Sequence, residues 1–191
     1  STLSTENNPY FYPSVAGSLM LSEFFSGKKW LDMWKLRGSW TMTKTPADIY
    51  EINSTYVVDN AVWGSLNSAY IPTELKSSDI RPQTSQTIEI GTAAVLYKNR
   101  VRFDITAYQK RLYDFLASAE LSEASGYYTK YVNTEEERTK KGLEVNIGGT
   151  PVQHKNLKWD INFNWSKDFT VYSKLDEQYT PDESWISVGE R

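Results

Sequence analysis

The chain has 191 residues, 39% of them hydrophobic, with 7 Trp and 13 Tyr but no Cys. A formal net charge of −3 and an isoelectric point near 5.3 argue against a nucleic-acid partner, because affinity for phosphate backbones depends on basic surfaces. The lack of Cys excludes disulfides and thiolate metal sites, and no apolar run reaches the ~18 to 20 residues that a membrane-spanning helix needs.

Alternation of apolar and polar residues with a period of two begins near the N-terminus and predicts β-strands. In the first strand, over residues 14–21, Val15 and Leu19 share one face while Ser14 and Ser18 share the other. In the second, over residues 34–42, Trp, Leu, Gly, Trp and Met alternate with Lys, Arg, Ser and Thr. Helical periodicity is almost absent, so we expect an all-β fold.

Residues 86–112 form the clearest predicted hairpin, because one register places apolar residues opposite apolar residues throughout. A two-residue turn at Lys98-Asn99 gives that register, and Asn99 tolerates the left-handed backbone of such a turn. The apolar pairs are Leu96 with Val101, Ala94 with Phe103, Thr92 with Ile105, and Ile90 with Ala107. The other face pairs Val95 with Arg102, Ala93 with Asp104, and Gly91 with Thr106. A slip of one residue would mix the two faces.

Two further strands are expected over residues 143–148 and 157–166, joined by a turn over residues 149–156 that Gly149 and Pro151 mark. The last strand has the most regular alternation in the chain. Its apolar face carries Leu157, Trp159, Ile161, Phe163 and Trp165, and its polar face carries Lys158, Asp160, Asn162, Asn164 and Ser166. One face therefore suits an apolar environment and the other suits water.

Long and short connections alternate along the chain. The long ones cover residues 43–85 and 113–140, whereas the short turns cover residues 22–29, 98–99 and 149–156. In an up-and-down antiparallel sheet this order places both long loops at one end and all short turns at the other. Transmembrane β-barrels of the outer membrane have this asymmetry, with the long loops outside the cell, so we expect about six membrane strands of such a barrel.

Alternation alone fits either a membrane barrel or a soluble, secreted β-sandwich that binds carbohydrate, since both have one apolar face per strand. Aromatic residues at the margins of the apolar faces favour the barrel. Trp159 and Trp165 lie roughly 20 Å apart along their strand, which is close to the height of a lipid-facing band between two aromatic girdles. We therefore expect a water-filled lumen on the polar side and membrane girdles formed by Trp34, Trp40, Trp159 and Trp165.

Few residues suggest a catalytic, metal-binding or ligand-binding site. His154 is the only His and lies in a predicted turn, so neither a catalytic triad nor a His-based metal site can be assembled, and we predict no enzyme activity and no cofactor. Glu135-Glu136-Glu137 fits a solvated loop flank better than a calcium site. In the same loop, Tyr127, Tyr128 and Tyr131 are candidate ligand contacts, because exposed aromatic faces stack on sugars and grip peptides. Loop packing or contact with a partner protein is the competing interpretation.

Short sequence motifs spread over nearly the whole chain recur in one known family. They are Tyr12-Pro13-Ser14-Val15, Leu21-Ser22-Glu23, Lys35-Leu36-Arg37-Gly38-Ser39-Trp40, Thr87-Ile88-Glu89-Ile90-Gly91, Asn99-Arg100 with Tyr108 and Lys110, Ser125-Gly126, Val132-Asn133, Lys141-Gly142-Leu143-Glu144 and Trp159-Asp160. By their order and spacing the chain resembles the SusC/RagA family of TonB-linked (TonB-dependent) outer-membrane proteins, found in Bacteroidetes. It departs from the family at Lys44-Thr45-Pro46, where Gly-Asn is usual, and at Gln83, where Glu is usual. These departures leave subfamily and substrate open.

The resemblance implies the rest of the expected architecture. Residues 1–191 would be part of the β-barrel domain of a TonB-dependent receptor, an internal fragment of a barrel of about 22 strands, without the plug and the remaining strands. The whole protein would import oligosaccharides or peptides across the bacterial outer membrane, with TonB acting through the plug and a SusD-like surface lipoprotein as a cap. The N-terminus also lacks the features of a signal peptide, so we expect a chain that begins partway through a longer protein.

Overall fold

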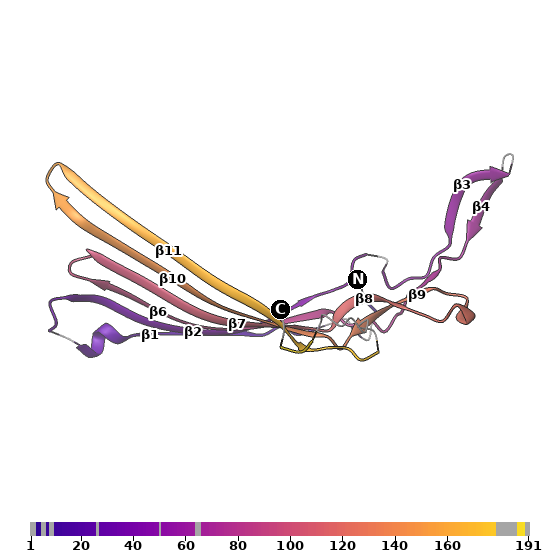
Figure 1. Cartoon of the computed structure of the whole chain (residues 1–191), viewed down its shortest axis with the longest axis horizontal. Helices are drawn as coiled ribbons and strands as arrows, with labels where there is room; N and C mark the ends of the chain where they lie inside the picture. Colours follow the sequence, from indigo (N-terminus) through magenta and orange to yellow (C-terminus); the bar gives the residue numbers. More distant parts are fainter. Residues whose placement is uncertain are drawn as a thin grey trace.

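The computed structural model describes residues 3–4, 7, 10–25, 27–49, 51–63, 66–178 and 187–189, with the side chains of residues 59–63 outside the description. The described part is all-β and contains one long, curved sheet with loops gathered at one of its ends (Figure 1). No helical segment in this part is long and apolar enough to cross a bilayer.

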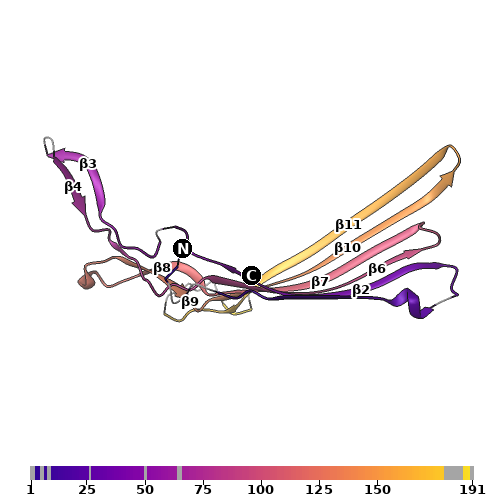
Figure 2. The same cartoon turned by 180° about the vertical axis from the view of Figure 1, so that it is seen from behind.

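Six strands form the main sheet in the order β1-β2-β6-β7-β10-β11, and each is antiparallel to its neighbours. Their bounds are β1 Ser14–Met20, β2 Leu31–Thr45, β6 Gln83–Leu96, β7 Val101–Tyr113, β10 Glu137–His154 and β11 Leu157–Lys174. The same order is visible from the opposite side of the molecule (Figure 2). The predicted up-and-down arrangement of about six strands is confirmed, and within the described residues the sheet stays open, with β1 and β11 at its edges.

The two long connections contain small sheets that the sequence did not predict. In the first, β3 (Val57–Trp63) pairs with β4 (Leu66–Tyr70). A second sheet joins the two connections, because β5 (Glu74–Leu75) pairs in parallel with β9 (Thr129–Thr134), which pairs with β8 (Phe115–Glu120). The short 3-10 helices are η1 (Leu21–Phe25) and η2 (Glu123–Ser125). Both long loops lie at one end of the main sheet and the short turns at the other, as predicted (Figure 1).

The strand register of the β6–β7 hairpin is the predicted one, with Leu96 opposite Val101 and Ile90 opposite Ala107. The length of its turn was predicted wrongly, because the turn occupies residues 97–100. Tyr97, Lys98 and Asn99 all have positive φ, and the N–H of Arg100 donates to the carbonyl of Leu96 at 3.0 Å. Three consecutive left-handed residues allow a four-residue turn to close the same register.

The β10–β11 turn was predicted too early. β10 continues through Pro151 to His154, and the turn consists of residues 155–156. A register shift between Gly149 and Val152 accounts for the difference, since Pro151 has no N–H to donate and at such a bulge the ladder is interrupted. The N–H of Thr150 instead donates to the carbonyl of Arg100 at 2.8 Å. Gly149 and Pro151 therefore mark a bulge within a strand.

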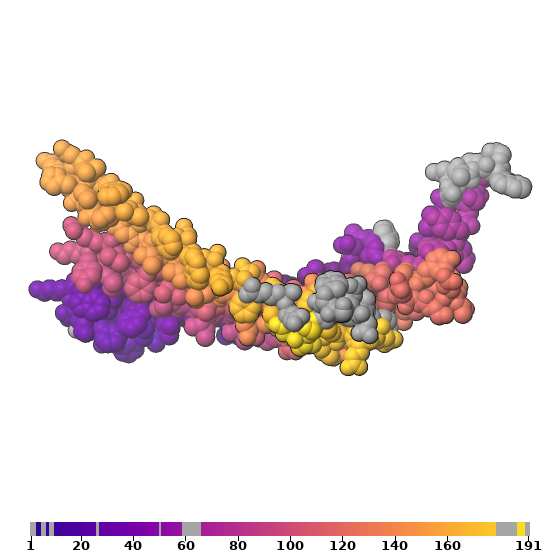
Figure 3. All heavy atoms as spheres, in the orientation of Figure 1, coloured from indigo at the N-terminus to yellow at the C-terminus, as the bar shows by residue number. Residues whose placement is uncertain are grey.

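The large apolar side chains of the main sheet are not part of a buried cluster. The buried cluster of the described part lies in the loop region and consists of Leu3, Ala47 and Ile80. By contrast, Trp159 and Phe163 on β11 are 56% and 58% exposed. The space-filling view shows the main sheet as a thin curved layer (Figure 3). Within the described residues no second sheet covers these side chains, so the alternative of a β-sandwich is wrong.

Candidate functional site

The main sheet has one apolar and one polar face, because residues of the two kinds occupy alternating rows across all six strands. One row of the apolar face consists of Leu19, Leu36, Thr92, Ile105, Val145 and Trp165. The neighbouring row of the polar face consists of Ser18, Arg37, Gly91, Thr106, Glu144 and Ser166. The predicted separation into an apolar and a hydrophilic side therefore holds over the width of the sheet.

A charged network crosses the polar face from β2 to β7. The guanidinium of Arg37 donates to both carboxylate oxygens of Asp104, at 2.6 and 2.7 Å, and to Oγ1 of Thr106 at 2.6 Å. It reaches β7 by lying across Gly91 of β6, where an added Cβ would be 2.7 Å from Nε of Arg37. Such bidentate pairs hold their geometry more firmly than single bonds. The absence of a side chain at Gly91 is what allows this contact.

An open basin of about 370 Å³ lies beside this network, and its polar lining includes Arg37, Asp104, Thr106 and Glu144. Further along the same face, Lys140 pairs with Asp168 at 3.0 Å, and Lys158 pairs with Asp160 at 2.9 Å. These side chains are only partly buried and carry both signs of charge. The face is therefore suited to contact with water and with polar solutes.

Two other glycines on the polar face also lie beneath long side chains of neighbouring strands. A Cβ on Gly142 would be 2.6 Å from the hydroxyl oxygen of Tyr108, and one on Gly148 would be 2.7 Å from Oδ1 of Asn162. The side chains of Tyr108 and Asn162 therefore lie flat against the sheet. The polar face of β7, β10 and β11 is therefore flat where these side chains cover the glycines.

The three tyrosines of the second long loop have different surroundings. Tyr128 is 58% exposed, and its backbone N–H donates to the carbonyl of Thr73 at 2.9 Å. Tyr127 is half-buried. Tyr131 lies on β9 and packs against the buried cluster of Leu3, Ala47 and Ile80. The structure thus offers the ring of Tyr128 to solvent and uses Tyr131 for packing between loops.

A three-residue ion cluster within the first loop contacts the second loop at Tyr131 and Ser118. Nζ of Lys76 lies 2.5 Å from Glu51, 2.6 Å from Glu74 and 5.2 Å from the centre of the Tyr131 ring. Burial opposes the charge on Lys76, but the hydrogen bonds to Glu51 and Glu74 outweigh it and raise the Lys76 pKa. The hydrogen bond from Lys76, with a second from Ser118, lowers the pKa of Glu74. Burial raises the pKa of Tyr131.

The four predicted girdle tryptophans all lie on the main sheet. Trp159 and Trp165 on β11 are 56% and 43% exposed, whereas Trp34 and Trp40 on β2 are half-buried. The ring of Trp34 stacks on Phe25 of η1 with centroids 5.7 Å apart, and its Nε1–H donates to Thr92 at 3.0 Å. Trp34 is therefore sheltered by η1 near the short turns, while the two tryptophans of the edge strand β11 are open to solvent.

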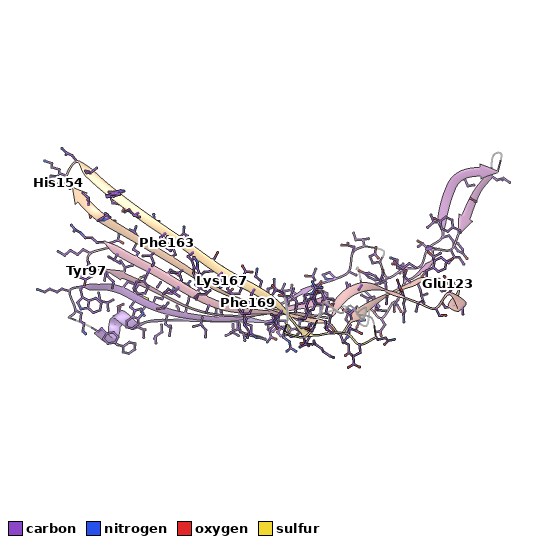
Figure 4. All side chains as sticks on the ribbon, in the orientation of Figure 1. Tyr97, Glu123, His154, Phe163, Lys167 and Phe169 are labelled. Atoms are coloured by element: carbon purple, nitrogen blue, oxygen red, sulfur yellow. The ribbon has the colours of Figure 1, made fainter. Side chains whose placement is uncertain are left out.

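The acidic run and the single histidine occupy the ends of the sheet. Glu135 pairs with Lys174, Glu136 with Arg138 and Glu137 with Arg111, so each carboxylate of the run has a cationic partner. His154 is exposed at the short-turn end of β10 (Figure 4). In the part of the chain that the structure describes, no group of three His, Cys, Asp or Glu side chains is arranged to hold a metal ion.

The sequence did not predict the charged network around Arg37 or the ion cluster around Lys76. It placed Asp104 opposite Ala93 in the predicted hairpin but did not find its partner, because Arg37 is two strands away and the pairing requires the β2-β6-β7 order. The Lys76 cluster had no signal in the sequence, since its residues come from irregular segments and β5.

Comparisons with known proteins agree with the fold. The sequence model described as "TonB dependent receptor-like, beta-barrel" matches residues 4–191. TonB-dependent receptor P3 of Formosa agariphila is 26% identical over 176 residues and covers 90% of this chain. TonB-dependent receptor P26 of the same organism is 24% identical over 163 residues and covers 83%. The chain spans only 18% and 16% of the lengths of these two receptors.

Solved structures of similar fold include those of one peptide transporter. The RagAB peptide importer in its open-open state has a TM-score of 0.83 at 19% identity, over 100% of this chain and 21% of that chain. Another structure of the RagAB peptide transporter has a TM-score of 0.80 at 20% identity, over 95% of this chain and 20% of that one. Together with the match over residues 4–191, the open antiparallel sheet shows that the chain belongs to the TonB-dependent receptor β-barrel family, whose members lie in the bacterial outer membrane.

Proposed function

We propose that this chain is part of the wall of an outer-membrane channel that imports nutrients with energy from TonB. The observation that carries the proposal is the contrast between the two faces of the main sheet. Among the described residues no protein segment covers the large apolar side chains of one face, as a lipid-facing wall requires. The polar face carries paired charges such as Arg37 and Asp104, as the wall of a water-filled lumen requires. The long loops then lie outside the cell.

We propose oligosaccharides or peptides as the substrate class. The basin beside Arg37, Asp104 and Glu144 offers donors and acceptors of both charges at a hydrated surface. Peptides carry charged termini and side chains that fit such a wall, and the RagAB relatives of similar fold are described as peptide importers. Hydroxyl-rich sugars would use the same donors and acceptors without requiring their charge.

The loops supply the proposed contacts at the entrance. The exposed ring of Tyr128 is available to stack on a sugar or grip a peptide. Tyr127 lies beside it, and Tyr131 holds the loop in place through the buried cluster. We also propose that Trp34, Trp40, Trp159 and Trp165 form the membrane girdles, since they border the apolar residues of β2 and β11.

A SusD-like surface lipoprotein is the proposed partner at the loop end. The β3–β4 hairpin projects away from the main sheet (Figure 1). Its described side chains include several that are large, apolar and more than half exposed, namely Val58, Leu66 and Tyr70. Exposed apolar groups of this size are typical of protein interfaces. TonB would act through a plug domain elsewhere in the whole protein.

Uptake by the full-length receptor tests the proposal. Cells that produce the receptor should take up a labelled peptide or oligosaccharide mixture only when TonB is functional. The variant Tyr128→Ala should reduce uptake several-fold without changing the amount of receptor in the outer membrane. Uptake that continues at the same rate without TonB, or with the receptor gene deleted, would contradict the proposed transport function. Unchanged uptake by Tyr128→Ala alone would remove only that residue from the ligand site.

A further inference from the structure

Two lysines interrupt the apolar face of the main sheet. Lys141 is two residues from Leu143 along β10, and Lys167 is two residues from Trp165 along β11, so both lie on the apolar face. Lys141 lies opposite Phe169, and Lys167 lies opposite Leu143. The two lysines are therefore diagonal neighbours, and such positions are about 7–8 Å apart in an antiparallel pair. Two flexible ammonium groups at this spacing can reach one small anion between them.

Among the described residues, these lysines differ from the other Lys and Arg residues of β10 and β11, which all have a carboxylate partner. Neither forms an ion pair among the described residues, and both are exposed. On the polar face, Lys140 pairs with Asp168 at 3.0 Å. One row further toward the loops, Arg111 of the apolar face is neutralised by Glu137 at 2.5 Å. Two unneutralised cations thus remain on the side of the sheet that faces lipid.

The two lysines lie toward the loop end of the apolar face. On β11 the apolar residues of this face run without interruption from Leu157 to Trp165, Lys167 follows on the loop side, and Phe169 and Val171 lie beyond it. Figure 4 shows Phe163, Lys167 and Phe169 in this order from the short-turn end toward the loops. In an outer-membrane barrel the loop side is the outer leaflet. Lys141 belongs to the same row as Trp40, a proposed girdle residue, so the two lysines lie near the outer margin of the lipid-facing band.

A shallow groove adjoins Lys141 on this face. It has a volume of about 340 Å³, and its lining includes Ile88, Ile90, Ala107, Gln109 and Lys141. Most of its exposed lining is apolar, with the polar groups of Gln109 and Lys141 toward the loop end of β7 and β10. This arrangement fits a molecule with a hydrocarbon chain and an anionic head.

We propose that Lys141 and Lys167 bind the phosphate groups of a lipid in the outer leaflet, whose acyl chain lies over the groove at Ile88 and Ile90. The proposal rests on the barrel fold and on the position of the two cations, and it does not depend on the transported substrate. The bound lipid would fix the height and tilt of this part of the wall, because two charge-assisted contacts hold a headgroup at one level of the strands.

Lipid binding by the full-length receptor, purified in a neutral detergent, tests the proposal. The probes are lipid A with its phosphates, the same lipid A after phosphatase treatment, and inorganic phosphate, and bound lipid is counted by native mass spectrometry. The double variant K141Q/K167Q should bind phosphorylated lipid A roughly 10- to 30-fold more weakly, as expected for two interfacial cations. The variant K141R/K167R should restore binding, which separates loss of charge from misfolding.

A matched control removes two lysines at the opposite end of the sheet. Lys98 and Lys155 are exposed in the short turns, so K98Q/K155Q changes the net charge equally and should bind lipid A as the unmodified receptor does. Equal binding of the two lipid A forms would overturn the proposal, as would unchanged binding by K141Q/K167Q. Complete displacement of lipid A by millimolar inorganic phosphate would assign the site to the free anion and also overturn it.

Discussion

Gly91 is a position where one added methyl group should disturb a defined contact. A Cβ there would lie 2.7 Å from Nε and 3.0 Å from Cζ of Arg37, whereas ordinary contacts begin at 3.4 Å. In the variant Gly91→Ala the guanidinium must therefore move by about 0.7 Å, the difference between 3.4 and 2.7 Å. Its hydrogen bonds to Asp104 are 2.6 and 2.7 Å long, and such a shift takes them to the limit of hydrogen bonding.

The expected cost follows from the exposure of the pair. A bidentate, charge-assisted contact contributes about 3 kcal/mol where it is buried. The side chains of Arg37 and Asp104 are 39% and 38% exposed, so solvent screens their attraction. We therefore expect Gly91→Ala to lower the free energy of unfolding by about 1 kcal/mol.

The assay is urea unfolding of the full-length receptor in lipid vesicles, followed by tryptophan fluorescence. Gly38→Ala on the adjacent strand is the matched control, because its Cβ would meet only the carbonyl of Glu89 at 3.8 Å. The general effect of replacing Gly by Ala in a strand is common to both variants. Only Gly91→Ala should lose the contact with Arg37.

The background variant Arg37→Met isolates the mechanism. Without the guanidinium, the added methyl group at Gly91 has nothing charged to displace, so its cost should fall to nearly zero. Equal stabilities of Gly91→Ala and Gly38→Ala would refute the reasoning. A cost of about 1 kcal/mol that persists in the Arg37→Met background would refute it as well.

Three other predictions concern the apolar face and the loops. Phe163→Arg should lower the free energy of unfolding in vesicles by about 2–4 kcal/mol, since it places a charge in the lipid-facing band; a change below about 0.5 kcal/mol in the same urea assay would contradict that placement. Tyr131→Ala should raise protease cleavage of the loops, because it removes a ring from the buried cluster, whereas Tyr128→Ala should leave cleavage unchanged; the reverse order would show that their roles are exchanged. The hydrogen bond from Lys76 lowers the pKa of Glu74, so the ionised Glu74 side chain stabilises the folded loops. This stabilisation is complete above the pKa of Glu in the unfolded chain, about 4.3, and is lost as pH falls through the pKa of Glu74 in the folded protein. Protection of the loop amides, taken as exchange relative to the intrinsic rate at each pH, should therefore fall on acidification below about pH 4 in the unmodified receptor, and by a smaller factor in Glu74→Gln.

The main sheet could be predicted from the sequence because its pattern repeats over many residues. The register of β6 and β7 follows from matching apolar with apolar positions, since a slip of one residue exchanges the faces. The length of the turn did not follow, because three left-handed residues include Tyr97 and Lys98, which carry no turn signal. Likewise Gly149 and Pro151 mark either a turn or a bulge, and the pairing partner decides which.

The loop structure could not be predicted from local patterns. Its short strands pair across long separations, as when β5 joins β9, and two-residue strands have no periodicity. Tyr131 illustrates the consequence, since an aromatic residue in a polar loop has the same sequence signal whether it binds a ligand or packs against Ile80. Contacts between loops, unlike alternation within a strand, depend on the arrangement of the whole domain.

Accessibility along β11 tests most directly whether lipid covers the apolar face. Spin labels would be placed one at a time at residues 159–164 of the full-length receptor in vesicles, and relaxation by oxygen and by a water-soluble nickel complex would be measured. Labels at 159, 161 and 163 should respond to oxygen, which concentrates in lipid, and labels at 160, 162 and 164 should respond to nickel. Odd-numbered labels that respond to neither reagent would mean that protein covers this face, and would contradict the membrane-wall account.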